Sequence, residues 1–257
     1  MRDLLQSEPY TADAALTAAS AGPLPEPVAR YFAFALPPSP RRIIAAEAEW
    51  KGTFLTRRGG RGMPFTARQR FLIDPPGFVW KADMKMFPGL HVRVRDGYDR
   101  GRGSTRARLG GIIAIANQPG TRHTGEAALQ RFLAEAIWFP TALLPSPRIE
   151  WLGVNNRRAT ATLSDGEHRA SVDFHFGDRG EIVGCSALRY RDVGGRHILT
   201  PWQTRSWDYE SVDGFMIPRS AEAEWILPEG SLTYWRGALE RMTYTFGADI
   251  SSHAGER

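Results

Sequence analysis

The stretch FVWKADMKM, residues 78–86, decides the fold, because its apolar side chains recur at every second position. Successive side chains of a β-strand point to opposite faces, so this spacing places them all on one face. They are Phe78, Trp80, Ala82, Met84 and Met86. The stretch AAEAEWKGTF, residues 45–54, has the same period, with Trp50 and Phe54 on the apolar face. Both stretches predict strands with one buried face.

The rest of the chain repeats this pattern in short segments between turns that contain Gly, Pro, Asn or Asp. The other predicted strands span residues 65–73, 90–98, 105–116, 148–154, 158–163, 169–176, 181–191, 198–209, 215–227 and 231–246. Parallel neighbours need connections of about a dozen residues or more, so this short spacing predicts an antiparallel meander. A sheet of about a dozen strands twists and curls. We therefore expect an α+β fold built on a large curved antiparallel β-sheet, a half-barrel or open barrel.

Two helical segments are predicted before the strands. Residues 10–21 are rich in helix formers, and residues 27–36 place Val28, Tyr31 and Phe32 on one side. The sequence PPSP at 37–40 then ends helical structure. These segments predict helices at the N-terminal end of the fold.

One more helix interrupts the strand series. The stretch TGEAALQRFLAEAIWF, residues 124–139, has apolar side chains at helical spacing, and Pro140 closes it. Thr124 is the predicted N-cap, and Glu126 falls in the first turn, where the helix dipole favours an acid. A curled sheet has a concave face that must be covered. This inserted central helix is the expected cover.

We predict three parts of the chain. Residues 1–40 form a helical segment that packs on the sheet, residues 41–247 form a single antiparallel β domain containing the inserted helix, and residues 248–257 form a disordered tail. The pentapeptide AEAEW occurs at 46–50 and again at 221–225. It is either a coincidence or the mark of two strands with the same role in one curved sheet.

The composition indicates a soluble globular protein, with 42% hydrophobic and 24% charged residues. No window approaches the roughly 20 apolar residues of a membrane span, and the N-terminus lacks a continuous apolar signal-like core. We therefore expect a cytoplasmic protein without an integral membrane segment. The single cysteine, Cys185, excludes an internal disulfide framework and a structural cysteine-type zinc site. The composition leaves the oligomeric state open.

The formal net charge is +5, and two basic stretches stand out, RRGGRG at 57–62 and RGRGSTRAR at 100–108. Glycine-rich runs between strands are typical of exposed hairpin tips. A stacking platform for single-stranded nucleic acid requires aromatic residues between the basic ones, and these stretches have none. We therefore expect no nucleic-acid partner.

Known catalytic and cofactor motifs are missing from the chain. It has no HExxH, no GxSxG and no GxxxxGK[ST] sequence, and the glycines of GYDRGRG are not followed by a βαβ pattern. The histidines form no close ligand pair. We therefore expect neither a metal ion nor a cofactor.

Glu135 stands in the apolar surroundings of QRFLAEAIWFPTALLP, residues 130–145. Arg131 precedes it by four positions, so one interpretation is a surface ion pair within the helix. The second interpretation is an inward ion pair with a strand arginine. The third is a direct role in catalysis or ligand binding.

Further candidates come from the strands and the aromatic residues. Arg189, near the end of one strand, and Tyr234, in the last, join Glu135 as predicted catalytic residues. Eight tryptophans could line a wide apolar cavity or form an ordinary β core. On the cavity interpretation, the predicted ligand-binding residues are Arg131, Trp138, Trp80, Met84, Trp50 and Trp225.

The segment RFLAEAIWFPTALLPSPRIEW, residues 131–151, is followed by ALRYRDVGG, PW at 201, GFMIP and YWRG. With these motifs the chain resembles, over about residues 25–246, a bacterial family described only as a domain of unknown function. The resemblance implies a half-barrel similar to the lipoprotein-carrier type, in which a curved sheet wraps around an apolar cavity lidded by helices. It assigns no catalytic residue.

Three function classes remain open. The first is a binding protein that holds a hydrophobic or lipid-like small molecule between sheet and helix. The alternative is a cofactor-independent cyclase, isomerase or hydrolase that acts on an apolar substrate, with Glu135 as general acid or base. The third is an interaction protein that uses the basic hairpin tips.

Overall fold

The computed structural model describes residues 23–118 and 120–247. The helix predicted at residues 10–21 and the tail predicted at 248–257 lie outside the described residues. The elements are α1 (Glu26–Ala35), β1 (Ile43–Phe54), β2 (Met63–Leu72), β3 (Gly77–Phe87), β4 (Leu90–Asp99), β5 (Arg102–Leu109), β6 (Ile113–Gln118), α2 (Arg122–Glu135), the 3₁₀ turns η2 (Ala136–Trp138) and η3 (Pro140–Leu143), β7 (Ile149–Asn155), β8 (Arg158–Asp165), β9 (His168–Phe176), β10 (Ile182–Val193), β11 (Arg196–Val212), β12 (Phe215–Leu227) and β13 (Gly230–Phe246).

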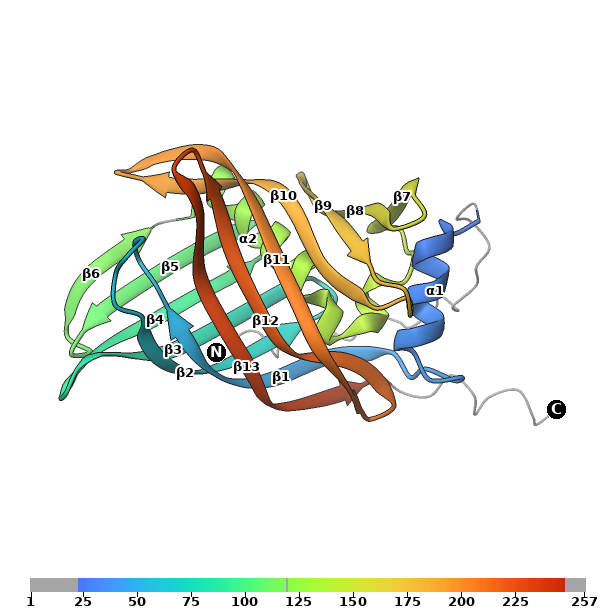
Figure 1. The fold of residues 1–257 in the computed structure, drawn as a ribbon, viewed down its shortest axis with the longest axis horizontal. Helices are drawn as coiled ribbons and strands as arrows, with labels where there is room; N and C mark the ends of the chain where they lie inside the picture. Colours follow the sequence, from blue (N-terminus) through green and yellow to red (C-terminus); the bar gives the residue numbers. More distant parts are fainter. Residues whose placement is uncertain (1–22, 119, 248–257) are drawn as a thin grey trace.

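The strands form one 13-stranded sheet in the order β6-β5-β4-β3-β2-β1-β13-β12-β11-β10-β9-β8-β7. Each recorded strand pair is antiparallel. β1 and β13 join the two arms of the sheet, and β6 and β7 are its two edges. The sheet curls into a half-barrel (Figure 1). The predicted large curved antiparallel sheet is therefore confirmed, and the fold is mostly sheet.

The alternation in β3 appears directly in its burial. Phe78, Trp80, Ala82 and Met84 are buried, while the intervening side chains are exposed or half-buried. The predicted strand at 105–116 is wrong as a single element, because a turn divides it into β5 and β6. Gly110 and Gly111 both have positive φ in that turn, a conformation that glycine adopts without strain. Much of the basic stretch 100–108 therefore lies in β5 and not at a hairpin tip.

The N-cap of the inserted helix α2 lies three residues earlier than predicted, and the helix begins at Arg122. Its N-cap is Thr121, whose side chain accepts a hydrogen bond from the Thr124 backbone N–H, while the Thr124 hydroxyl accepts one from the Thr121 N–H. Thr124 is thus the third helical residue of a capping box. The prediction of Thr124 as N-cap is wrong, and Glu126 lies beyond the first turn. The α-helix ends at Glu135, and the chain continues as η2 and η3.

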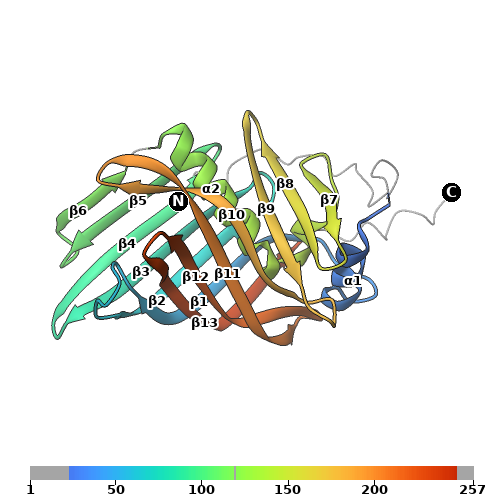
Figure 2. The ribbon, with the colours of Figure 1, turned by 45° about the horizontal axis from the view of Figure 1, so that its top comes forward.

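α2 carries the chain from edge strand β6 to edge strand β7. It contacts β4 and β5 on one arm and β8, β9 and β10 on the other (Figure 2). Its buried residues, Gly125, Ala127, Ala128, Leu129, Phe132, Leu133 and Ala134, surround most of the helix. The helix therefore lies within the curve of the sheet, as expected of a cover.

The space between the helical segment and the sheet is filled with aromatic side chains. The rings of Trp50 and Trp138 meet edge to face at 4.8 Å, and those of Phe71 and Phe139 lie 4.6 Å apart. The Trp138 Nε1–H donates to the Pro218 carbonyl at 2.8 Å. Packing of this kind is typical of a solid β core. It leaves no wide apolar cavity around these residues.

The N-terminal helix α1 packs against β7, β8 and β12. Val28, Tyr31 and Phe32 are buried, as their predicted spacing indicates. Within the described ranges, no helix has both the length and the apolar character needed to cross a membrane.

The two AEAEW copies lie in β1 and β12, the strands on either side of β13. In both copies the alanines are buried in the core. The glutamates face the other side of the sheet, where Glu47 pairs with Arg70 and Glu222 pairs with Arg236. The two copies thus place the same residue types on the same faces.

Candidate functional site

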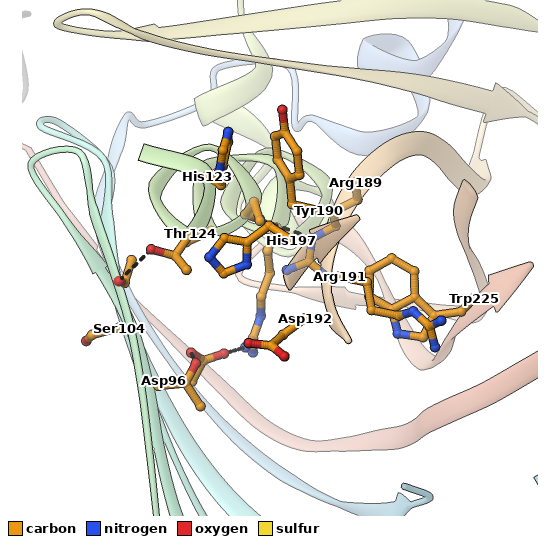
Figure 3. Close-up of a pocket in the computed structure, with 15 residues that line it drawn as sticks. Asp96, Ser104, His123, Thr124, Arg189, Tyr190, Arg191, Asp192, His197 and Trp225 are labelled. Carbon is orange, nitrogen blue, oxygen red and sulfur yellow. Dashed lines mark hydrogen bonds and ion pairs between the residues drawn. The ribbon is translucent and has the colours of Figure 1, made fainter. Parts of the chain in front are cut away.

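A cavity of about 150 Å³ lies between the N-terminal half of α2, strands β4 and β5, and the end of the β10–β11 hairpin. Figure 3 shows Asp96 and Ser104 on one wall, Arg189, Arg191 and Trp225 on the other, and His123 and His197 nearby. The cavity is open to solvent on one side. It is where charged and aromatic side chains from both arms of the sheet and from α2 converge.

Arg131 of α2 lies in the cavity wall and is held by two carboxylates. Its Nη1 is 2.5 Å from Asp96 Oδ2, and its Nε is 2.8 Å from Glu135 Oε1. Its guanidinium carbon is 4.8 Å from the Phe78 ring centroid and 5.4 Å from that of Trp80. Burial opposes the charge, but the two carboxylates outweigh it and raise the pKa of Arg131. Arg131 is therefore a permanently charged and already neutralised group.

Glu135 accepts a second hydrogen bond, from Gln69 Nε2 at 2.7 Å. Gln69 belongs to β2 and is 2% exposed. The carboxylate is thus tied to its own helix and to the sheet, and Glu135 is not among the residues that line the cavity. Its position combines the predicted Arg131 pair with an inward orientation.

Arg189 and Arg191 enter the cavity from β10. Their guanidinium carbons lie 5.7 Å and 6.0 Å from the Trp225 ring centroid, and that of Arg189 is also 5.1 Å from Trp202. The Arg189 Nε–H donates to the Ala127 carbonyl at 3.1 Å, which fixes the side chain against α2. Within 23–118 and 120–247, neither arginine pairs with a carboxylate. Among the described residues, both cations therefore lie in the wall without a carboxylate partner.

Two aromatic side chains, Tyr234 and Trp202, hold Trp225 in place. Tyr234 of β13 stacks on Trp225 with ring centroids 5.8 Å apart and planes 24° apart. The Tyr234 hydroxyl accepts a hydrogen bond from Trp202 Nε1 at 3.0 Å. Tyr234 thus holds the indole of Trp225 in place and is not itself among the lining residues.

The rim near the start of α2 carries two histidines. The His123 ring lies 4.3 Å from Tyr190 and 5.6 Å from His197, centroid to centroid. His197 Nε2 is 3.5 Å from the Thr121 hydroxyl. These contacts join the β10–β11 hairpin to the helix N-terminus. Across the described residues, no group of three or more His, Cys, Asp or Glu side chains is arranged to hold a metal ion.

A second depression, of about 290 Å³, lies at the N-terminus of α2, beside Arg102, Glu167 and His168. It is more open, and Arg122 at its edge pairs with Glu126. It has no aromatic wall like that of the first cavity.

The predicted site residues fall into two groups. Arg131, Arg189 and Trp225 line the cavity, and Glu135 and Tyr234 contact them directly. The other predicted ligand-binding residues lie in the core, each at most 5% exposed: Trp50, Trp80, Met84 and Trp138. The roles assigned to all of them stay predictions.

Sequence reasoning missed part of the cavity. Asp96 reaches Arg131 across 35 positions, and His123 and His197 meet across 74, so no local pattern marks them. Arg191 is not one of the missed residues: it lies two positions after Arg189 on the same strand and face, so the alternation marks both as candidates from the sequence.

Cys185 is buried and lies 3.1 Å from the Thr204 hydroxyl, sulfur to oxygen. Burial raises the pKa of its thiol to about 12. The thiol therefore stays protonated at neutral pH and is a core side chain.

Three solved structures resemble the chain at low similarity. A DUF1329 family protein from Desulfovibrio piger has 13% identity and a TM-score of 0.45, covering 80% of this chain and 88% of that chain. A putative outer membrane lipoprotein-sorting protein domain from Vibrio parahaemolyticus has 10% identity and a TM-score of 0.40, covering 80% and 87%. A LolA superfamily protein from Nitrosomonas europaea has 8% identity and a TM-score of 0.35, covering 86% and 93%.

Similarity at this level transfers no ligand or activity to the chain. Among curated proteins, no sequence matches it. The sequence profile of a family of unknown function, DUF6544, matches residues 14–237. That match spans most of the chain, which therefore belongs to the DUF6544 family.

Proposed function

We propose that the chain is a binding protein for a small amphipathic molecule, which it holds in the cavity between α2 and the β10–β11 hairpin. The observation that carries this proposal is the group formed by Trp225, Arg189 and Arg191, in which one indole and two guanidinium groups line a solvent-open cavity. Ligand sites combine apolar walls with a few fixed polar groups that orient the ligand. Trp225 supplies the apolar wall, and Arg189 and Arg191 supply the polar groups.

The size of the cavity limits what enters it. Sites for drug-sized ligands have volumes of about 300–1,000 Å³, whereas this one has about 150 Å³. The cavity therefore takes a small ligand, or one end of a longer molecule whose remainder lies outside. Ile198 pairs with Arg191 across the hairpin and is 44% exposed, which gives the rim an apolar side chain for that remainder.

The geometry favours binding over catalysis. The Glu135 carboxylate is occupied by Arg131 and Gln69 and does not line the cavity. A general base must come within about 2.6–3.2 Å of the proton that it removes. Glu135 would have to leave two hydrogen bonds to reach a substrate in the cavity.

Native mass spectrometry after incubation with lipid and metabolite extracts tests the proposal. We expect the wild-type chain to retain small-molecule adducts and Trp225→Ala to lose most of them. The matched control is Trp207→Ala, because Trp207 is 38% exposed and lies outside the cavity. A wild-type chain that emerges empty from every extract contradicts the proposal, as does equal adduct retention by Trp225→Ala.

A further inference from the structure

We infer that the cavity selects an organic acid, with a carboxylate or phosphate held by Arg189 and Arg191 and a ring-sized planar group against Trp225. This inference rests on the proposed function and adds the chemical class of the ligand. It depends on the charge state of the wall, the free donors of the two arginines and the cavity size.

Among the described residues, some charged side chains in the cavity wall have a partner of opposite charge, and others do not. Arg131 is paired with both Asp96 and Glu135, so its positive charge is already engaged and the three groups together carry a net negative charge. Asp192 is also engaged, because it accepts a hydrogen bond from the Gly195 N–H within the hairpin turn. Arg189 and Arg191 are the cations that remain, and among the described residues no carboxylate pairs with either.

The two arginines also retain hydrogen-bond donors. The Arg191 Nε is buried and has no hydrogen-bond partner among the described residues. Buried donors in native proteins are nearly always satisfied, so an unpaired one in a ligand-sized cavity indicates a missing acceptor. Arg189 uses its Nε on Ala127, and the hydrogen bonds of the described residues leave its terminal nitrogens available. Arginine donors in this arrangement match the paired oxygens of a carboxylate or phosphate.

The size and the aromatic wall define the rest of the ligand. An apolar cavity of about 150 Å³ accommodates benzene, so one ring fits here. Trp225 presents an indole beside the two guanidinium groups. A planar ring that carries an acidic group satisfies both the size and the charge.

Isothermal titration calorimetry with four probes of matched size tests the inference: benzoate, phenyl phosphate, benzyl alcohol and benzylamine. We expect the two anions to bind at least about tenfold more tightly than benzyl alcohol, because each hydrogen bond to a charged group is among the stronger ones. Benzylamine should show no measurable binding. Benzyl alcohol reports on the cavity alone and so tests the proposed function separately.

Arg191→Gln is the critical variant. Among the described residues, the Arg191 guanidinium makes no hydrogen bond or ion pair, so we expect the substitution to leave the fold intact. We expect it to weaken benzoate binding at least about tenfold and to weaken benzyl alcohol binding much less, because that probe carries no charge. Arg196→Gln is the control for net charge, since Arg196 is exposed in the same hairpin and does not line the cavity. It should bind benzoate like the wild type.

The outcomes separate the inference from the proposed function. Equal binding of benzoate and benzyl alcohol overturns the anion preference while the proposed function stands. If Arg191→Gln and Arg196→Gln weaken benzoate binding equally, the anion preference comes from the overall charge of the protein. That result also overturns the inference. A third outcome is that neither anion binds, while Trp225→Ala still loses the adducts that the wild type retains from extracts. The cavity then binds a neutral ligand, which overturns the inference and leaves the proposed function standing.

Discussion

Arg131 of α2 and Asp96 of β4 form an ion pair in which Nη1 and Oδ2 are 2.5 Å apart. The same guanidinium contacts Glu135 one helical turn away, and Glu135 accepts a hydrogen bond from Gln69 of β2. A single network therefore joins the covering helix to two strands of one arm of the sheet. The side chains of Arg131, Asp96 and Glu135 are only 17–25% exposed, so solvent screens them weakly.

We expect Arg131→Met to destabilise the fold by about 3 kcal/mol, because it leaves two partly buried carboxylates without their cation. The control is Arg122→Gln in the same helix, which breaks the Arg122–Glu126 pair at an exposed position and should change stability little. Urea unfolding followed by far-ultraviolet circular dichroism measures both variants. Equal stability of the two variants would show that the network does not anchor α2.

This network shows where prediction from sequence succeeds and where it stops. The Arg131–Glu135 pair was one of three interpretations of Glu135, as a surface pair, because a spacing of four places two side chains on one side of a helix; the pair is present but largely shielded from solvent. Asp96 and Gln69 were not predicted, because contacts between distant segments leave no periodic signal. The same holds for the strands. Alternation predicted β3 from its own residues, whereas the pairing of β1 with β13 joins distant segments and is a property of the whole sheet.

The boundaries and the cavity were harder to predict for a related reason. The pattern of 124–139 predicted a helix, but Thr121 and Thr124 form a reciprocal cap, so the N-cap lies three residues earlier than predicted. The tryptophans were equally compatible with a cavity wall and a core. Trp50 and Trp138 pack against each other because η2 turns the chain after Glu135, and that turn was not predicted.

Trp138→Phe tests whether this tryptophan belongs to the core. The change removes the donor to the Pro218 carbonyl and part of the ring that meets Trp50, so we expect a loss of about 2 kcal/mol or more. Binding of benzyl alcohol should be unchanged, because Trp138 does not line the cavity. Trp207→Phe, at an exposed position, should change neither property. If Trp138→Phe weakened benzyl alcohol binding without lowering the free energy of unfolding, Trp138 would instead be a ligand-binding residue.

The two AEAEW copies allow a matched comparison of buried and exposed glutamates. The Glu222 side chain is 4% exposed and contacts both Arg205 and Arg236, whereas that of Glu47 is 57% exposed and contacts Arg70. We expect Glu222→Gln to cost about 1–3 kcal/mol, because hydrogen bonds between charged groups are lost where water does not replace them. Glu47→Gln should stay within about 0.5 kcal/mol of the wild type. Chemical denaturation checks both, and equal costs would contradict the assigned difference in burial.

The last prediction concerns acid stability and His175 of β9. Burial lowers the pKa of His175, and its Nε2 lies 2.9 Å from the Ser186 hydroxyl. In the unfolded chain the pKa of a histidine is about 6.5, which is higher than the pKa of His175 in the folded state. As the pH falls, the unfolded chain therefore binds a proton at this position before the folded protein does. The stability that the neutral imidazole contributes is therefore present above about pH 6.5 and is lost below it.

His175→Gln keeps a polar partner for Ser186 but cannot take up a proton. Its unfolding free energy should fall less than that of the wild type between about pH 7.5 and pH 5. Asp83 does not obscure this window: a hydrogen bond from His91 lowers the pKa of its carboxyl from 3.8, so its contribution is lost only at more acidic pH. Urea unfolding at both pH values gives the difference directly. Parallel losses in the variant and the wild type would show that His175 is not the group that couples stability to pH in this range.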